Sequence, residues 1–390
     1  MKGYKHVLLA MGLSAIINGM LYPILSLYVY NISEDFFLVG LIMALPFLAA
    51  VPMSFVWGMV SDRIGSRRIV IIITGCIGAS MFFIFPFVDT TGLIILRLVQ
   101  VAFLTSMVLL NAMATEFFPK RKGTSIGDLA LVGAIGQAGG ALAAGILLPS
   151  RFMFIGSDAV TLVFSIAGIV TILASLSLVP MKGRARKAEF TNLRSMLSFG
   201  ERRGIFIVSL VALIMPLSGY LIFSVFPVYL KSLEIPWDST MVAGVFTALS
   251  AITGIFASGI AGRACDRYGR KWVLVGSGAA YFLVWVGMGL TRQPLLTAIL
   301  WAIPVWSFFY VSAITMVSDM TKPEERGRGI GLVNSSISMG AAAGSILAGY
   351  VLSREVMDNT FFLAAIVALV GMFVALAVRE TLMHRPKRIL

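Results

Sequence analysis

Apolar and polar residues alternate along this chain in long blocks rather than one by one. Each apolar block has about 20 residues, enough to cross a hydrocarbon core of roughly 30 Å as a helix, and short polar segments separate the blocks. The single-residue alternation typical of membrane-spanning strands is absent. The pattern therefore predicts twelve membrane-spanning helices. We expect them over residues 7–30, 36–58, 69–88, 91–115, 124–149, 158–180, 204–230, 240–262, 271–291, 294–318, 328–352 and 359–379.

Composition indicates the same class of protein. Of the 390 residues, 58% are hydrophobic and 13% are charged, whereas a soluble domain carries about 25% charged residues. The two cysteines, Cys76 in an apolar block and Cys265 in a charged loop, provide neither a disulfide framework nor a metal-ligand cluster. The sequence contains no nucleotide-binding loop and no plausible catalytic triad. We therefore expect an all-α membrane protein that is not an enzyme and uses no cofactor.

The formal net charge of +13 would suit a nucleic-acid ligand, but nucleic-acid-binding proteins gather their basic residues on one soluble face. Here the basic residues lie in the short segments between apolar blocks. When these segments are assigned alternately to the two sides of a membrane, 26 of the 31 lysines and arginines fall on one side, 4 on the other, and Arg97 inside a helix. Because cytoplasmic loops carry the excess of lysine and arginine, we expect a multi-pass protein of the cell membrane with both termini in the cytoplasm.

One long polar stretch divides the chain into two parts. Residues 181–203 contain seven lysines or arginines, and we interpret them as a cytoplasmic basic linker. They separate an N-terminal bundle of six helices, residues 1–180, from a C-terminal bundle with a short cytoplasmic tail, residues 204–390. The cations of the linker either only fix topology against anionic lipid or belong to a short helix on the membrane surface.

The two parts are related by an internal repeat at an offset of 204 residues. The run Gly-x-x-x-Asp-Arg-x-Gly occurs whole at residues 58–65 and again at 262–269, which chance matches among abundant glycines do not explain. Other corresponding pairs are Pro23 with Pro227, Gly40 with Gly244, and Gly145 with Gly349. One offset that holds from the first helix to the fifth indicates two homologous halves, as expected where two halves rock about a central site.

Both copies of this run resemble the signature loop of the major facilitator superfamily. The segments GMVSDRIGSRR at 58–68 and GRACDRYGRK at 262–271 are similar to the loops that this family carries between helices 2 and 3 and between helices 8 and 9. The second copy fits throughout, whereas the first has Ser66 where the family usually has a basic residue. The resemblance covers essentially the whole chain and implies twelve helices arranged as two pseudo-symmetric six-helix bundles.

Two further motifs resemble those of the drug/proton antiporter branch of this family. The helix 4 pattern Leu93-x-x-x-Arg97-x-x-Gln100 is similar to one of them, although Val101 stands where a glycine is usual. The other lies in helix 5, where alanines replace its proline and one of its glycines. Its matching residues are Gly127, Gly136, Gly140 and Gly145. The resemblance implies a proton-coupled exporter of drug-like compounds.

Helix 11 repeats the glycine spacing of helix 5. Small residues at these spacings let helix backbones approach closely. The glycines then form either a sliding contact between the two halves or a static packing surface. Those of helix 11 are Gly331, Gly340, Gly344 and Gly349.

The resemblance also implies a latch that holds the cytoplasmic side shut while the central site faces outward. Asp62 would face the cytoplasmic start of helix 11, and Asp266 that of helix 5. The ion pairs expected beside the loops join Glu116 to Arg67 and Asp319 to Arg270. Alternatively, these charges only fix topology. The predicted gating residues are Asp62, Arg63, Arg67, Glu116, Asp266, Arg267, Arg270 and Asp319.

Arg97 is the one formal charge well inside an apolar block, about 9 Å below the outer end of its helix at 1.5 Å per residue. No aspartate or glutamate lies at mid-depth in any predicted helix, and a buried arginine is costly unless it faces a cavity with a partner. Three roles are open for it. In the first, Arg97 binds an anionic group of the substrate, or alternates between the substrate and Asp158. In the second, it tunes a proton-carrying group. In the third, its side chain snorkels to the outer interface.

The superfamily resemblance places helices 1, 4, 7 and 10 around the substrate cavity, with candidates from helices 5 and 11. Each polar side chain there could instead make an interhelical hydrogen bond. The predicted substrate or proton pathway comprises Arg97, Gln100, Asn18, Tyr22, Asn111, Gln137, Tyr220, Tyr310, Asn334 and Asp128.

Three functions are compatible with these observations. The leading hypothesis is a monomeric secondary active transporter that works by alternating access in the lipid bilayer and exports small amphiphilic or drug-like molecules in exchange for protons. The second is transport of a small organic anion anchored by Arg97. The third is a membrane receptor without transport, which would have no need of two intact latch loops. No nucleic-acid partner is expected.

Overall fold

The computed structural model describes residues 2–117, 122–149, 154–181, 203–233, 237–291, 293–322, 325–354 and 357–381. The predicted basic linker lies almost wholly outside the described residues, and so does the C-terminal tail beyond residue 381. In the described part of the chain all regular secondary structure is helical, as predicted.

Twelve segments of the described chain are helical, long and apolar enough to cross a membrane, which confirms the predicted number. Side-chain caps define several helix starts: Asp35, Asp89 and Asp238 each accept a hydrogen bond from a backbone N–H in the first turn that follows, where unpaired amides favour an acceptor. The α-helices are α1 (Lys2–Ser33), α2 (Phe36–Ile64), α3 (Arg67–Ser80), α4 (Thr90–Leu104), α5 (Leu109–Phe117), α6 (Lys122–Leu147), α7 (Asp158–Leu176), α9 (Arg203–Phe223), α10 (Phe226–Ser232), α11 (Ser239–Tyr268), α12 (Arg270–Leu290), α13 (Pro294–Trp301), α14 (Val305–Met320), α15 (Arg326–Leu352) and α16 (Met357–Leu376).

Four spans are interrupted where the sequence predicted continuous helices. The third ends in two short 3₁₀ turns, and the fourth joins α4 to α5 through another. The seventh breaks between α9 and α10, because Pro227 lacks the N–H that would bond the Phe223 carbonyl one turn earlier. The tenth breaks between α13 and α14 at Pro304, since the residue before a proline is disfavoured in helical conformation.

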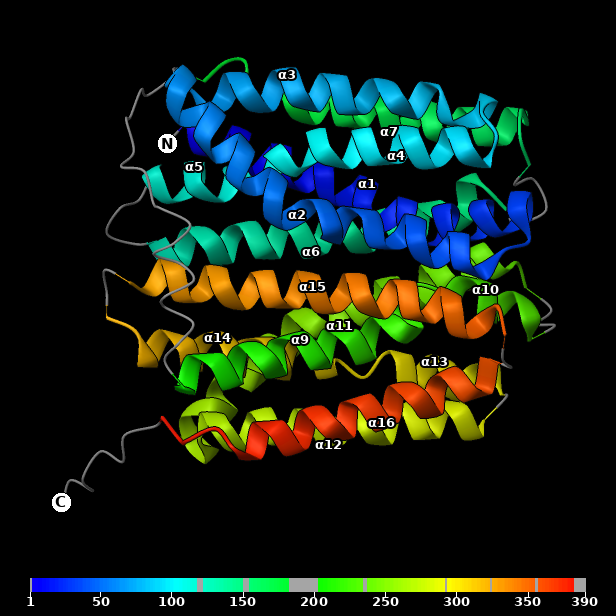
Figure 1. Ribbon diagram of the computed structural model, residues 1–390. Helices are drawn as coiled ribbons and strands as arrows, with labels where there is room; N and C mark the ends of the chain where they lie inside the picture. The colour runs from blue at the N-terminus through cyan, green and yellow to red at the C-terminus, as the bar shows by residue number, and fades with distance from the viewer. Residues whose placement is uncertain are drawn as a thin grey trace.

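The spans form two bundles that lie against each other. Figure 1 shows the first six spans on one side and the last six on the other, with the start of α1 and the end of α16 at the same end of the molecule. Both signature loops lie at that end, which we call the basic end. They are tight turns, because Gly65 has φ 71° and Gly269 has φ 97°, a region of backbone conformation that favours glycine.

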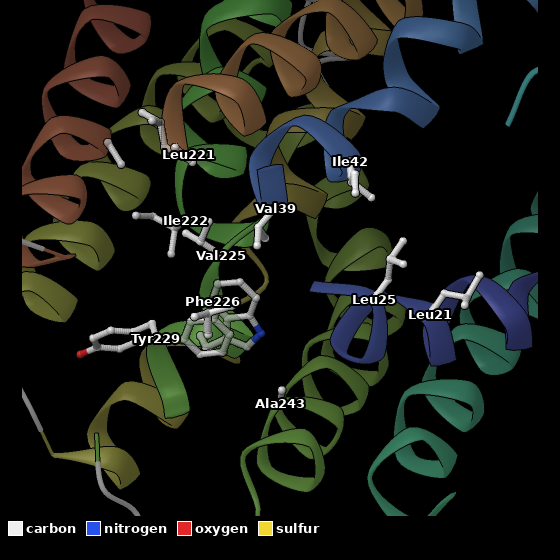
Figure 2. Close-up of a cluster of buried hydrophobic side chains, with 14 of the residues drawn as sticks. Leu21, Leu25, Val39, Ile42, Leu221, Ile222, Val225, Phe226, Tyr229 and Ala243 are labelled. Carbon is white, nitrogen blue, oxygen red and sulfur yellow. The ribbon is translucent and has the colours of Figure 1, made fainter. Parts of the chain in front are cut away.

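The halves share a hydrophobic core whose first-half members lie toward the opposite end of the molecule. One cluster of buried side chains contains Leu25 and Val39 from the first half together with Val225 and Phe226 from the second. Figure 2 shows Val39 of α2 near Val225 and Phe226 of the seventh span. A separate cluster toward the basic end, which includes Tyr4, draws all its buried members from the first half. The shared core therefore joins the halves mainly away from the basic end.

Candidate functional site

A cavity of about 650 Å³ lies between the halves, within the range of small-molecule sites. The first half contributes residues of α6, from Gly127 to Gln137. The second half contributes the rest of the lining, from α9, α11, α12 and both parts of the tenth span. The cavity is thus lined mostly by the second half.

Aromatic side chains form much of the cavity wall. The rings of Tyr281 and Trp285 stack with centroids 5.7 Å apart, and those of Phe223 and Trp301 stack with centroids 5.9 Å apart. Trp301 in turn lies 3.8 Å from Phe226, with the two rings nearly parallel. The aromatic residues of the lining are Tyr220, Phe223, Tyr281, Trp285, Trp301 and Trp306. None of the described lining residues is charged.

The break in the tenth span lies in the cavity wall. It frees backbone groups that a continuous helix would pair, and a neighbouring hydroxyl group satisfies one of them, because the Thr253 hydroxyl donates to the Ala302 carbonyl at 2.9 Å. Just after the break, the Ser307 hydroxyl donates to the Gly254 carbonyl of α11 at 3.1 Å. Irregular backbone at membrane depth is tolerated where it lines a cavity or is buried in protein, and these two bonds hold the broken span against α11.

Two of the predicted pathway residues, Gln137 and Tyr220, line this cavity. Tyr22 is buried instead, and its hydroxyl donates to the Phe223 carbonyl across the halves. The Tyr310 hydroxyl lies 3.5 Å from Asn334 Oδ1, so these two predicted residues contact each other. The other predicted residues do not border this cavity: Asn18 and Asn111 are exposed on α1 and α5, and Arg97, Gln100 and Asp128 have the contacts given below.

Asp128 lies in the second turn of α6, near the basic end. Its Oδ2 atom accepts a hydrogen bond of 2.8 Å from the Tyr4 hydroxyl. This contact joins α6 to α1 within the first half. It places the carboxylate away from the aromatic wall.

Sequence reasoning missed Tyr281 and Trp285 because they belong to the ninth span, outside the four helices expected around the cavity. Two signals were available. Both residues are large aromatics one turn apart on a single helix, and Pro304 stands inside the expected tenth helix, where a proline predicts a break. That break lies next to the part of the cavity that Tyr281 and Trp285 line.

Arg97 is buried, with 9% of its surface exposed, and its guanidinium donates to Gln100 Oε1. Gln100 is fully buried. The Arg97 Nε and Gln100 Nε2 atoms have no hydrogen-bond partner in the described part of the chain. Of the three roles left open for Arg97, snorkelling to the outer interface fits these contacts least, because the side chain bonds within its own helix and is buried.

Aromatic contacts close the cavity toward the opposite end. The Tyr22 hydroxyl donates to the Phe223 carbonyl at 2.6 Å, and their rings stack 4.0 Å apart. This carbonyl is the one that Pro227 leaves without a helical partner. Tyr220 meets Phe47 of α2 edge to face at 4.7 Å, and Lys231 donates to Asn31 Oδ1 at 2.6 Å. The halves are thereby joined where α1 and α2 meet the seventh span.

Four glycines let the halves approach further at this end. A Cβ on Gly40 would overlap the Ser345 carbonyl, and one on Gly349 would lie 2.6 Å from the Phe36 carbonyl oxygen. The repeat-related contact joins α6 and α11, where a Cβ on Gly145 would overlap Met241 and one on Gly244 would overlap the Ala141 carbonyl. Both contacts join one half to the other.

Four other glycines of the two predicted series, which lie in α6 and α15, pack within one half rather than between the halves. Gly136 and Gly140 of α6 pack on the backbone of α1, and Gly340 and Gly344 of α15 pack on that of α9. These four contacts lie within single halves. Among the glycines of these series whose surroundings the structure describes, the last of each, Gly145 and Gly349, contacts the other half.

At the basic end, the ion pairs expected beside the signature loops are present. Arg67 pairs with Glu116 in the first half, and Arg270 pairs with Asp319 in the second. The Asp266 side chain is 75% exposed, with its carboxylate 4.0 Å from Arg270. Within the described chain, neither Asp62 nor Asp266 bonds to the other half. A Cβ on Gly58 or Gly262, next to the loops, would meet nothing within 4 Å.

The segment after α16 adds a contact that the sequence did not predict. Glu380 accepts hydrogen bonds of 3.1 Å from the backbone N–H groups of Arg270 and Lys271, so its carboxylate caps the start of α12. The Thr381 hydroxyl donates to Asp319 at 3.1 Å. The other predicted loop cations, Arg63 and Arg267, are exposed, and Arg267 lies over the Tyr268 ring.

The family model described as Major Facilitator Superfamily matches residues 7–261 and 208–389. Two relatives in Bacillus subtilis (strain 168), Multidrug resistance protein 2 and Multidrug resistance protein 1, are each 28% identical to this chain. The matches cover 47% and 41% of this chain and 46% and 41% of those proteins, so less than half of each relative is matched. The Uncharacterized MFS-type transporter YuxJ of the same organism is 22% identical over 90% of this chain and 92% of its own length.

Solved structures share the fold at low sequence identity. The nucleoside transporter NupG superimposes with a TM-score of 0.80 and 16% identity, over 97% of this chain and 99% of that one. A bacterial homolog of the human lysosomal transporter Spinster, in an inward-facing and occupied conformation, gives 0.79 and 15%, over 96% and 95%. With the family model matching nearly the whole chain and two six-span bundles enclosing a cavity, this protein belongs to the Major Facilitator Superfamily.

Proposed function

We propose that this protein is a secondary active transporter that exports small amphiphilic or drug-like compounds by alternating access. The observation that carries the proposal is the cavity between the halves, which is lined by aromatic side chains and by no charged residue among those described. Such a lining suits molecules with large apolar surfaces. Partial similarity to two multidrug resistance proteins supports the same substrate class.

The arrangement of the two ends supports alternating access. Aromatic and glycine contacts join the halves at the opposite end, while the glycines beside the signature loops have open space at the basic end. If the basic end is cytoplasmic, as the charge bias predicts, the structure is inward-facing. An exporter in this state would load its substrate from the cytoplasm or the inner leaflet.

Proton coupling is part of the proposal, although no carboxylate lines the cavity in the described chain. The candidates are Asp128, which bonds Tyr4 in the first half, and the buried Arg97, which would act on a neighbouring proton-carrying group. An organic anion anchored by Arg97 fits less well, because Arg97 does not border this cavity. A receptor that does not transport would not explain why the halves are joined at the opposite end but have open space beside the signature loops at the basic end.

The test begins with a ligand-induced thermal-shift screen of purified protein and continues with flux in proteoliposomes. We expect compounds from the screen to be concentrated only when a pH gradient is imposed. Flux that ignores the gradient would contradict proton coupling but not transport. Binding without any flux would support the receptor alternative.

The signature loops give a prediction for the gate at the basic end. Asp266→Asn or Asp62→Asn should shift the population toward the inward-facing state by roughly two- to fivefold, the effect of one exposed ion pair. Substrate affinity should change little, because both residues lie far from the aromatic wall. Distances between spin labels on the basic ends of α2 and α11 report the shift.

Asp158→Asn provides the matched control, since this exposed carboxylate lies at the opposite end of the molecule. It should leave the spin-label distances unchanged. Wild-type distance distributions in both loop variants would mean that the loop aspartates serve only folding or topology.

A further inference from the structure

We propose that the aromatic part of the cavity, which we call the chamber, binds uncharged planar aromatic compounds that carry hydrogen-bond acceptors. The chamber is formed by Tyr220, Tyr281, Trp285, Trp301 and Trp306, all in the second half. This inference rests on the proposed transport function and narrows its substrate class. Three features of the chamber support it: ring geometry, a buried donor without a partner, and the absence of charge among the described lining residues.

The geometry of the rings favours flat ligands. Phe223 and Trp301 are parallel within 13°, and Tyr281 and Trp285 within 30°. Trp306 also stacks on its helix neighbour Tyr310 within 17°. Side chains held in stacked pairs present fixed ring faces, and an aromatic ligand gains most from an offset stack on such faces. A planar molecule can use several of these faces at once, whereas a branched aliphatic molecule cannot.

The chamber has one buried hydrogen-bond donor that lacks an acceptor in the described part of the chain. Trp301 is 8% exposed, and its indole N–H has no hydrogen-bond partner in the described part of the chain. An indole N–H can only donate, and a buried donor left unpaired is costly. The N–H of Trp285 is used, because it donates to the Ser218 hydroxyl at 3.0 Å. A ligand acceptor that reaches the Trp301 N–H would remove the cost of leaving it unpaired.

A backbone acceptor beside the chamber is already used. The break in the tenth span would leave the Ala302 carbonyl free, but the Thr253 hydroxyl donates to it at 2.9 Å. The remaining polar side chains of the wall, such as Tyr281 and Gln137, can both donate and accept. The indole N–H of Trp301 can only donate, so a ligand with an acceptor satisfies a group that a ligand without one cannot.

Charge is disfavoured because no lysine, arginine, histidine, aspartate or glutamate is among the described lining residues. An ion that leaves water loses its hydration, and without an opposite charge the protein does not replace it. Aromatic faces attract cations, but this attraction is smaller than the cost of desolvation. A neutral ligand has no such cost, so it should bind more tightly than a cation of the same shape.

Three probes of nearly identical shape test these features separately. At mildly alkaline pH, 6-methoxyquinoline is neutral and has a ring-nitrogen acceptor. In 2-methoxynaphthalene a C–H replaces that nitrogen, and N-methyl-6-methoxyquinolinium carries a fixed positive charge. Dissociation constants are measured by saturation-transfer NMR on the full chain in nanodiscs, with the signal of empty nanodiscs subtracted.

We expect the quinoline to bind about 2- to 12-fold more tightly than the naphthalene, the range of one neutral hydrogen bond, and at least tenfold more tightly than the quinolinium. Trp301→Phe, which keeps a ring and removes the N–H, should abolish the quinoline's advantage over the naphthalene. Trp272→Phe is the matched control, because Trp272 is exposed at the basic end, and it should change neither constant. Tyr281→Phe provides a second variant if Trp301→Phe does not fold.

Several results would overturn the inference. Equal or tighter binding of the quinolinium would mean that the chamber selects cations. Equal binding of quinoline and naphthalene in the wild type, or an unchanged difference in both Trp301→Phe and Tyr281→Phe, would remove the donor argument. Failure of all three probes to bind would remove the chamber as a site. If the quinoline binds as expected but is not transported in proteoliposomes, the proposed transport function is contradicted while the chamber remains a binding site.

Discussion

Replacing Gly40 with valine is expected to abolish transport while both halves stay folded. Gly40 of α2 lies against α15 of the other half, where a Cβ would overlap the Ser345 carbonyl and lie 2.9 Å from the Gly349 nitrogen. These neighbours are backbone atoms, so no rotamer change relieves the overlap. Overpacking of this kind costs about 1–3 kcal/mol, which would shift the equilibrium away from the observed state by roughly 5- to 150-fold.

Two measurements check this prediction. Spin-label distances across the opposite end should lengthen in Gly40→Val, and substrate flux in proteoliposomes should fall to background. Gly340→Val is the contrasting variant, because a Cβ there would overlap the Leu213 carbonyl within the second half. It should lower the yield of folded protein without opening this end. Wild-type distances and flux in Gly40→Val would show that closure here does not depend on the glycine contact.

The repeat extends this expectation to the other contact between the halves. Gly40 corresponds to Gly244 at the offset of 204 residues, and Gly145 corresponds to Gly349. The structure places these four residues in two equivalent contacts, α2 with α15 and α11 with α6. A sequence repeat can predict such pairs of equivalent positions. It does not say which glycines face their own half, because adjacent glycines on one helix can pack on different neighbours.

The main features of the fold were predictable from sequence because they depend on block length and spacing. Twelve apolar blocks gave twelve spans, and the signature loops gave turns at Gly65 and Gly269 with positive φ. The ion pairs of Arg67 and Arg270 were also predicted, since each arginine follows such a turn and an acidic residue ends a neighbouring span. All these features are local, or are repeated in both halves.

The lining of the cavity was predictable only in part. Gln137 and Tyr220 were identified, but the cavity extends to the ninth span, where Tyr281 and Trp285 lie. Its shape depends on where Pro304 interrupts the tenth span and on how far the halves separate at the basic end. Neither the side-chain packing around such a break nor the separation of the halves follows from hydrophobic periodicity.

The surroundings of Arg97 lead to the second large expected effect. The guanidinium donates a hydrogen bond to Gln100, which lies on the same helix and is fully buried. Gln100→Met keeps the volume and removes that acceptor. A hydrogen bond to a charged group contributes about 1.5–3 kcal/mol, so Gln100→Met should lower the free energy of unfolding by that amount. Unfolding by sodium dodecyl sulfate in mixed micelles measures the difference.

The double variant separates stability from function. Replacing a buried polar pair by apolar side chains of similar volume is often neutral or stabilising, so Arg97→Met combined with Gln100→Met should recover most of the stability that Gln100→Met loses. In the double-mutant cycle, the coupling term between the two positions would then offset part of the stability that Gln100→Met loses. A double variant as unstable as the sum of the two singles would show that Arg97 has a further stabilising partner.

Transport should not follow stability, because variants at Arg97 can recover stability and still lose coupling to protons. If Arg97 belongs to a proton relay, Arg97→Met and Arg97→Lys should still exchange substrate down its gradient but fail to concentrate it when a pH gradient is imposed. Lysine keeps the charge but not the planar fork of donors that reaches Gln100, so it should not restore coupling. Full coupled transport by both variants would remove Arg97 from the mechanism. A variant that is stable yet uncoupled would show that the buried charge is kept for transport, because the fold does not require it.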